Sequence, residues 1–282
     1  MTERHFETGT TVSTRIQQTF ETLKSNGQMA FMPFVTAGDP DMTGTQKLIS
    51  TLAATGVNLI EVGFPYSDPI ADGPVIQSSY TRALNKKLTV HQIFDAVSEL
   101  PTDELPPLVA MVSYAIIFRI GPKAFVESAR DAGFSGFIIP DLPGDEAEEM
   151  FGVVREAGLD LIQLVAPTTP RERVWEILKA CSGFVYCIAV AGTTGTRENL
   201  QTDLLDQLAW LRAETSLPLA VGFGISKPEH VDPLRNLADG VIVGSGIVRH
   251  LNEIGEGPEA LDTALEAIST FSTSMVQATK PS

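Results

Sequence analysis

Eight short apolar runs recur along the chain, and segments with helical spacing lie between them. The runs are nearly continuous in apolar residues, which is typical of strands that are buried on both faces in a parallel sheet. Gly and Pro residues bound many of them and keep them at the length of strands. The predicted strands are 29–35, 59–61, 108–112, 136–139, 161–165, 184–188, 219–221 and 241–243.

Helices are predicted between these strands. Two of them carry start signals, in which a capping residue is followed by a proline and a capping-box glutamate. The signals are Thr169-Pro170-Arg171-Glu172 and Ser226-Lys227-Pro228-Glu229. The predicted helices cover about 12–24, 43–54, 75–84, 122–132, 145–157, 170–181, 202–213, 227–238 and 258–274.

The order of these elements predicts the α/β class and a (β/α)8 barrel, or TIM barrel, with an extra N-terminal helix. Eight strand–helix units in 282 residues match the size of that fold. A doubly wound open sheet is the alternative, but no Gly-rich dinucleotide-binding turn follows the first strand. Because no linker divides the chain, we expect a single domain over 1–282, with a core of about 12–275 and a polar arm at 1–11.

The charge balance argues against nucleic acid as a partner. The formal net charge is −15, whereas nonspecific binding to nucleic acid depends on Lys and Arg. Hydrophobic residues make up 43% of the chain, yet no apolar run reaches the ~18 residues of a membrane span. Cys181 and Cys187 lack the spacing of a zinc site and are interpreted as reduced, buried residues. Since the N-terminus is polar and lacks a signal peptide, we expect a soluble cytoplasmic protein.

One carboxylate ends the second predicted strand, and another lies in the loop that follows. Glu61 stands in an apolar run, where an unpaired charge is costly to bury. The loop 63–74 contains Asp72, and folding of this loop over the strand end would bring the two carboxylates together. Two carboxylates in different surroundings are suited to acid–base catalysis. The alternative is that Glu61 is an ion-pair partner in the core, and spacing alone does not decide between them.

Glycine-rich turns follow the last two predicted strands. One is Gly222-Phe223-Gly224-Ile225-Ser226, and the other is Gly244-Ser245-Gly246-Ile247. Both lead into helix starts, where free N–H groups and the helix dipole favour a phosphate. Barrels of this class often bind phosphate after strands seven and eight. Either turn alone is better explained as a tight connection, but the two together predict a phosphate site, with the hydroxyl of Ser245 as a further donor.

The segment 189–199 after the sixth strand is rich in Gly and Thr and longer than a minimal turn. It is interpreted either as a lid that closes over the site or as an ordinary surface loop. Phe34, Tyr186 and Phe223 lie at or beyond strand ends, as barrel core or as an aromatic lining for a flat apolar substrate. No His or Lys falls at the C-terminal end of a predicted strand, which argues against a His triad, a metal site or a Schiff base.

Three segments of the chain carry a specific resemblance. They are Pro33-Phe34-Val35-Thr36-Ala37-Gly38-Asp39-Pro40, the long segment 61–77 that begins Glu61-Val62-Gly63-Phe64-Pro65-Tyr66-Ser67-Asp68, and the turn at 222–226. Together they resemble the tryptophan synthase alpha chain family. The resemblance extends over about 20–251, and the long segment is its most specific part. It implies a barrel that cleaves indole-3-glycerol phosphate into indole and glyceraldehyde 3-phosphate by a retro-aldol step, with no cofactor and no metal.

The resemblance also implies roles for individual residues. Glu61 is the general acid–base, and Asp72 accepts a hydrogen bond from the indole N–H. Thr194 orients Asp72 when the lid closes. The residues implied at the phosphate are Gly195, Gly224, Gly244 and Ser245, and those implied around the indole are Phe34, Leu164, Tyr186 and Phe223.

A beta chain is the partner that the resemblance implies, in an α2β2 tetramer with pyridoxal phosphate on the beta chain. Asp68 matches the loop that touches this partner. The chain departs from the family at Ala115, where an asparagine associated with the subunit contact is usual, and at Thr193, where an aliphatic residue is common.

Three other interpretations are compatible with parts of the sequence. The first is a stand-alone indole-releasing lyase, which Ala115 favours. The second is a non-catalytic barrel that serves as a scaffold or an allosteric subunit, and the presence of both carboxylates argues against it. The third is another phosphate-binding barrel, such as an isomerase, which would share the glycine turns but not the segment 61–77.

Overall fold

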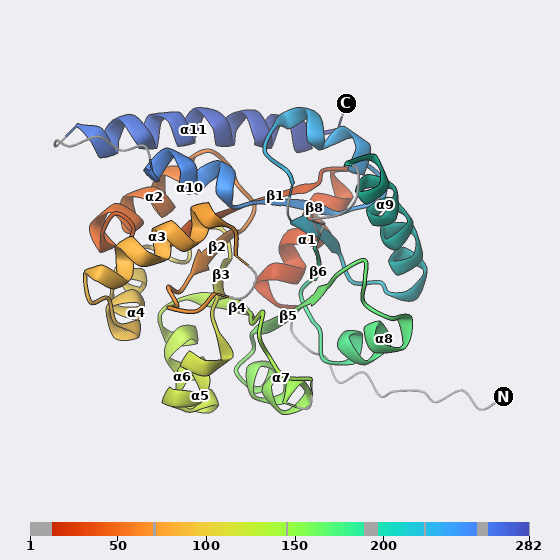
Figure 1. Cartoon of the computed structure of the whole chain (residues 1–282), viewed down its shortest axis with the longest axis horizontal. Helices are drawn as coiled ribbons and strands as arrows, with labels where there is room; N and C mark the ends of the chain where they lie inside the picture. The colour runs from red at the N-terminus through yellow and green to blue at the C-terminus, as the bar shows by residue number, and fades with distance from the viewer. Residues whose placement is uncertain are drawn as a thin grey trace.

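Eight strands, each parallel to its neighbours, close into a barrel in the order of the chain (Figure 1). The computed structural model describes residues 13–69, 72–144, 146–188, 197–222, 224–252 and 259–281. The (β/α)8 barrel predicted from the sequence is confirmed. The strands are β1 (Ala30–Thr36), β2 (Ile60–Gly63), β3 (Leu108–Met111), β4 (Phe134–Ile138), β5 (Asp160–Val165), β6 (Val185–Ile188), β7 (Leu219–Gly222) and β8 (Gly240–Val243).

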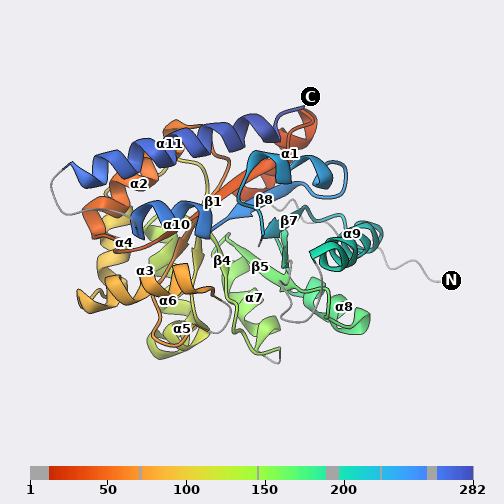
Figure 2. The ribbon, with the colours of Figure 1, turned by 45° about the horizontal axis from the view of Figure 1, so that its top comes forward.

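Helices surround the barrel on its outside, as the two ribbon views show (Figures 1 and 2). The last helix packs across the second and tenth, and the tenth packs on the third. The helices are α1 (Arg15–Ser25), α2 (Met42–Ala54), α3 (Pro74–Asn85), α4 (Val90–Ser98), α5 (Tyr114–Ile120), α6 (Pro122–Asp131), α7 (Ala147–Glu156), α8 (Arg171–Lys179), α9 (Arg197–Glu214), α10 (Ser245–Asn252) and α11 (Ala260–Thr279), with two 3-10 turns, η1 (Pro228–His230) and η2 (Asp232–Leu234).

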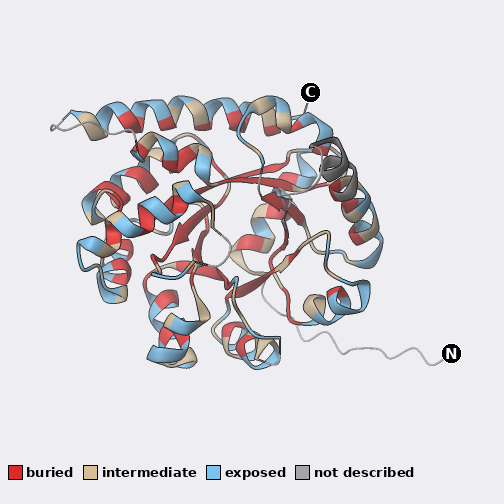
Figure 3. Cartoon of the chain, viewed as in Figure 1, coloured by how far each residue is buried: buried red, intermediate tan, exposed pale blue. Residues whose placement is uncertain are grey.

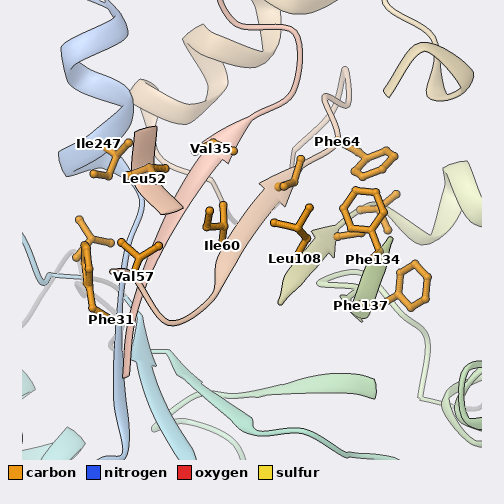
Figure 4. Packing of buried hydrophobic residues seen from close by; sticks show 14 of the residues in the cluster. Phe31, Val35, Leu52, Val57, Ile60, Phe64, Leu108, Phe134, Phe137 and Ile247 are labelled. Carbon is orange, nitrogen blue, oxygen red and sulfur yellow. The ribbon is translucent and has the colours of Figure 1, made fainter. Parts of the chain in front are cut away.

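The strands are buried on both faces (Figure 3), and their residues alternate between two apolar layers. Residues that point outward pack against the helices, and Figure 4 shows Phe31, Val35 and Ile60 in this layer. Residues that point inward, such as Met32 and Leu59, form a second cluster inside the barrel. Burial of both faces explains why the strands are nearly continuous in apolar residues.

The extra N-terminal helix, α1, closes the end of the barrel at which the strands begin. Its apolar face belongs to the cluster inside the barrel, where the rings of Phe20 and Phe184 lie 5.6 Å apart. Thr14 is the N-cap of α1, and its hydroxyl also donates to Oδ2 of Asp160 at 2.5 Å. Because Asp160 is the first residue of β5, this hydrogen bond attaches the helix to the barrel wall.

Two predictions about element bounds were wrong. β2 continues through Gly63, so Glu61 lies within the strand and does not end it. The segment predicted as a helix at 227–238 forms the two 3-10 turns η1 and η2 instead. Pro233 lacks the N–H that an α-helix would use at this point, and Asn236 has a φ of +66°, which ends the helical conformation.

The two predicted capping boxes are not formed. α8 begins at Arg171 without a side-chain cap, and the hydroxyl of Thr169 accepts the N–H of Ala166 instead. At the second segment, the N–H of Ser226 donates to Nδ1 of His230 at 3.2 Å. Two short helices, α4 and α5, stand where no helix was predicted, whereas α10 begins at the helix start predicted after the eighth strand.

Both cysteines are buried free thiols, as predicted. Burial raises the pKa of each thiol to about 12, so both remain protonated at neutral pH. Among the described helices, none is long and apolar enough to cross a membrane.

A partly buried ion pair contributes to the placement of α3 and α10. The guanidinium of Arg82, on α3, donates to both carboxylate oxygens of Asp39 at 2.9 and 2.6 Å. Asp39 is 1% exposed and lies in the loop after β1. Arg82 also donates to Oδ1 of Asn252, the last residue of α10. The two helices that follow the glycine turn of β8 and the loop of Asp72 are thereby fixed relative to each other.

Candidate active site

Glu61 points into the barrel from β2. Ile60 and Val62 belong to the outer apolar layer and Leu59 to the inner cluster, so the alternation of the strand places Glu61 on the inner face. Its side chain is 1% exposed, and its Oε1 has no hydrogen-bond partner among the described residues. Leaving a buried polar atom unpaired is costly. An unpaired carboxyl oxygen that borders a cavity is therefore a candidate to bind or protonate a ligand.

A cavity of about 250 Å³ lies at the C-terminal ends of the strands. Glu61 and Asp72 both line it, the first from β2 and the second from the loop before α3. The structure thus brings together the two carboxylates that the sequence singled out. The residues that line the cavity are Phe34, Glu61, Asp72, Gly73, Pro74, Val75, Ile76, Met111, Tyr186, Gly224, Ile225, Ile242, Gly244, Ser245 and Arg249.

Burial raises the pKa of both carboxyl groups, and raises that of Glu61 further. Loss of water raises the pKa of Glu61 from 4.5 to about 8 and that of the half-buried Asp72 from 3.8 to about 6. At pH 7, Glu61 therefore keeps its proton while Asp72 is ionised. Two acidic groups whose environments separate their pKa values in this way can act as a proton donor and a charged stabiliser at one site.

Two tyrosines lie beside the carboxylates. Tyr186 lines the cavity from β6, and Tyr80 is buried on α3. Burial raises the pKa of each phenol well above 10, and the nearby carboxylates raise it further. For Tyr80 the larger charge effect comes from Asp72, and for Tyr186 it comes from Glu61. Both phenols are therefore neutral and can donate a hydrogen bond.

Glycines at two strand ends make room for the aromatic rings of the site. A Cβ on Gly63 would lie 2.3 Å from the ring of Phe34, and a Cβ on Gly222 would lie 2.2 Å from the hydroxyl of Tyr186. Any larger residue would displace these rings from the cavity. The close approach of ring to backbone explains glycine at the ends of β2 and β7.

The first turn of α10 borders the cavity directly after β8. Gly244 and Ser245 line the cavity, as does Gly224, which has a φ of +80° beyond β7. The carbonyl of Gly244 accepts the third and fourth N–H groups that follow it, at 3.0 and 3.1 Å. Among the described residues, the N–H groups of Ser245 and Gly246 have no acceptor. Three of the predicted phosphate residues thus lie together beside free backbone donors.

The predicted indole residues are placed less uniformly. Phe34 and Tyr186 line the cavity. Leu164 pairs with Tyr186 across β5 and β6 and packs in the inner cluster, but it does not reach the cavity. Residues 189–196 of the predicted lid, which include Thr194 and Gly195, lie outside the described residues, as does Phe223. The last three residues of the predicted lid, 197–199, begin α9.

Asp68 is exposed and borders a second, smaller cavity of about 40 Å³. Its carboxylate accepts a hydrogen bond from the hydroxyl of Ser67 at 2.6 Å. Asp72 and Met111 line both cavities and therefore lie between the larger cavity and the smaller one beside Asp68.

Sequence reasoning missed several residues of the site. Met111 and Ile242 are inward-facing strand residues, and counting alternate positions along each strand would have found them. Tyr80 lies within a helix, where its apolar spacing indicates only core. Arg249 was missed although it stands four residues after Ser245, which places both on one helix face. No group of three or more His, Cys, Asp or Glu residues in the described part of the chain is arranged to hold a metal ion.

Comparison with known proteins identifies the family. The sequence profile described as "Tryptophan synthase alpha chain" matches residues 20–280. The tryptophan synthase alpha chain of Rhodopirellula baltica is 45% identical over 273 residues, which cover 94% of this chain and 98% of that one. The alpha chain of Methanocaldococcus jannaschii is 41% identical over 248 residues, which cover 86% and 88%.

Solved structures agree with this assignment. Tryptophan synthase subunit alpha from Legionella pneumophila superposes with a TM-score of 0.83 at 35% identity, covering 95% of this chain and 98% of that one. The aminoacrylate-bound form of tryptophan synthase from Mycobacterium tuberculosis gives a TM-score of 0.83 at 28% identity, covering 95% and 100%. The chain therefore belongs to the tryptophan synthase alpha chain family.

Proposed function

We propose that this chain is the alpha subunit of a tryptophan synthase and that it cleaves indole-3-glycerol phosphate into indole and glyceraldehyde 3-phosphate. The observation that carries the proposal is the position of Glu61 and Asp72 on one cavity, with pKa values of about 8 and about 6. The reaction is a retro-aldol cleavage, so the protein must move protons and stabilise charge, and carboxyl groups in two protonation states can do both.

Glu61 is the general acid and then the general base. In its protonated form it donates a proton to C3 of the indole ring, and the ring nitrogen becomes positively charged. The resulting carboxylate takes the proton from the glycerol hydroxyl next to the ring. The carbon–carbon bond then breaks, its electron pair returns to the ring, and the hydroxyl carbon becomes the aldehyde. Glu61 ends the cycle protonated, and no water or co-reactant is consumed.

Asp72 stabilises the charge that develops on the ring. Its carboxylate, ionised at neutral pH, accepts a hydrogen bond from the indole N–H, and this bond strengthens as the nitrogen becomes positive. Because the stabilisation is greater in the transition state than in the bound substrate, it raises turnover more than it tightens binding. We also propose that Thr194, in the segment that follows β6, orients the side chain of Asp72.

The remaining residues bind the two ends of the substrate. Phe34 and Tyr186 supply aromatic surface for the indole, and we add Leu164 and Phe223 to this set from the family resemblance. The free N–H groups at the start of α10 support binding of the phosphate. The residues assigned to the phosphate are Gly195, Gly224, Gly244 and Ser245.

Members of the family pair with a beta chain. For this chain we propose an α2β2 tetramer in the cytoplasm, with the loop of Asp68 at the contact between the subunits. The alpha reaction proposed here needs no cofactor, and pyridoxal phosphate belongs to the beta chain. We further propose that 1–282 forms one domain.

The test is release of indole from indole-3-glycerol phosphate by the purified chain, alone and with a beta chain. We expect weak activity alone and strong stimulation by the partner. Glu61→Gln should lower turnover by about 10²- to 10⁴-fold, the usual effect of losing a general acid–base group. Glu127→Gln, which removes an exposed carboxylate from α6, is the matched control and should keep full activity. A Glu61→Gln protein with unaltered turnover would refute the assignment of Glu61.

A further inference from the structure

We propose that Arg249 binds the phosphate group of the substrate. It supplies the full positive charge that the backbone N–H groups of the phosphate site lack. The inference rests on the proposed function, because it concerns how the same cavity recognises its substrate. The phosphate site expected from the sequence contains glycines and Ser245 but no charged side chain. The structure adds Arg249 to the lining of the cavity beside them.

The position of Arg249 on α10 favours a side chain that points toward the start of this helix, where Gly244 and Ser245 lie. Ser245 and Arg249 are four residues apart and therefore share one face of the helix. Side chains on a helix lean toward its N-terminus. The N-terminus of α10 is the end that borders the cavity, and both residues line that cavity. A guanidinium side chain one turn after Ser245 that leans in this direction is long enough to reach a phosphate held at the free N–H groups of the first turn.

The guanidinium of Arg249 is not engaged elsewhere in the described part of the chain. Arg249 is exposed, and it forms no hydrogen bond or ion pair with a described residue. Arg82, on the neighbouring helix, is different, because its guanidinium is held by Asp39 and Asn252. The first arginine is therefore available for a ligand, whereas the second has a structural role.

The charge of the cavity explains why such a residue is needed. Glu61 and Asp72 line it, and the chain carries a formal net charge of −15. A phosphate monoester adds a charge of about −1.5 to −2 at neutral pH. Backbone N–H groups offer partial charges only. Among the described residues that line the cavity, Arg249 alone carries a full positive charge, and a guanidinium can bind two phosphate oxygens at once.

The role predicts an effect on binding and not on the chemical step. The phosphate is not altered by the cleavage, so a contact to it is equally strong in the bound substrate and in the transition state. Loss of such a contact raises KM and leaves kcat nearly unchanged. Loss of Glu61 or Asp72 has the opposite signature, which separates the two kinds of residue.

The experiment compares Arg249→Gln with the unaltered chain, with the beta chain present. We expect KM for indole-3-glycerol phosphate to rise about tenfold to a hundredfold, with kcat changed less than about threefold, as for the loss of one charge-assisted contact. The inhibition constant of inorganic phosphate should rise in parallel, and the affinity for indole, which has no phosphate, should stay the same. The KM of the unaltered chain should also depend more steeply on salt than that of the variant.

Two further variants serve as controls. Lys123→Gln removes the same charge from an exposed position on α6, away from the cavity, and should leave KM unchanged. Arg249→Lys keeps the charge but loses the contact to two phosphate oxygens, so it should recover part of the affinity for phosphate. If Arg249→Lys loses as much as Arg249→Gln, or if Lys123→Gln has an equal effect, the charge at this position does not bind the phosphate and the proposal is overturned.

Direct binding separates this inference from the proposed function. Calorimetry with inorganic phosphate requires no turnover, so it gives a result even if the chain does not cleave indole-3-glycerol phosphate. Weaker phosphate binding in Arg249→Gln supports the role of Arg249 whatever the reaction is. Unchanged phosphate binding in Arg249→Gln, or an equal loss of phosphate and indole binding, contradicts it.

Discussion

Replacing Glu61 by glutamine should raise the free energy of unfolding above that of the unaltered chain, by a difference that grows as the pH rises. Burial raises the pKa of Glu61 from 4.5 to about 8, so the folded state holds this proton more tightly than the unfolded chain does. Below pH 4.5 both states are protonated and there is no penalty. Between pH 4.5 and 8 the unfolded chain releases the proton, and the free energy of unfolding falls with pH. Above pH 8 the penalty is complete.

The magnitude follows from the two pKa values. The interval from 4.5 to 8, at about 1.36 kcal/mol per pH unit, gives a loss of about 5 kcal/mol for the unaltered chain, of which about 3 kcal/mol is present at pH 7. No reduction for solvent screening applies, because Glu61 is 1% exposed. Glutamine has nearly the same shape and does not ionise. The free energy of unfolding of Glu61→Gln should therefore exceed that of the unaltered chain by a margin that widens with pH.

Urea unfolding at pH values from 4 to 9, followed by circular dichroism, measures this margin. The change in the margin with pH is the informative quantity, because a fixed offset reflects only the different packing of an amide. Glu127→Gln, at an exposed site on α6, should run parallel to the unaltered chain at every pH. Parallel curves for Glu61→Gln as well would show that Glu61 is ionised in the folded state, and the assignment of a protonated acid would fail.

Other measurements test the remaining parts of the site and fold. The kcat/KM for indole-3-glycerol phosphate should rise with pH as Asp72 ionises near pH 6 and fall as Glu61 ionises near pH 8; a flat profile from pH 5 to 9 would contradict this assignment. Asp72→Asn should lower kcat more than it raises KM, and unaltered turnover with a raised KM would show that Asp72 only binds. Thr14→Ala removes the cap of α1 and a hydrogen bond to Asp160, so it should lower the free energy of unfolding by about 1–2 kcal/mol in urea; unaltered stability would refute that role.

Periodicity predicted the barrel because both faces of its strands are buried. Each strand therefore appears in the sequence as a continuous apolar run, which differs clearly from the mixed polar and apolar pattern of the helices on either side. The extra helix α1 was predicted at 12–24, although its place at the base of the barrel was not. The prediction of a helix at 227–238 was wrong because Pro233 and the positive φ of Asn236 interrupt the helical backbone. The spacing of apolar residues does not predict such local effects.

The part of the candidate site that could be predicted is the part where a charged residue interrupts an apolar strand. Glu61 stood out because a carboxyl group in an apolar strand needs an explanation, and the structure places it on a cavity with Asp72. Tyr80 and Arg249 were not found, because a tyrosine or an arginine on an amphipathic helix is ordinary. Their significance depends on which end of each helix borders the cavity, and that is a property of the assembled barrel.

The attachment of α1 has a consequence for the chemistry at the other end of the molecule. Ile16, Phe20 and Leu23 of this helix are buried in the apolar cluster inside the barrel, at the end opposite the cavity, and contribute to the burial of Glu61. The raised pKa of Glu61 thus depends in part on the apolar face of α1, although this helix does not contact the substrate. Changes that loosen the N-terminal helix would hydrate the interior, return Glu61 toward ordinary acidity, and weaken catalysis without altering any residue at the rim.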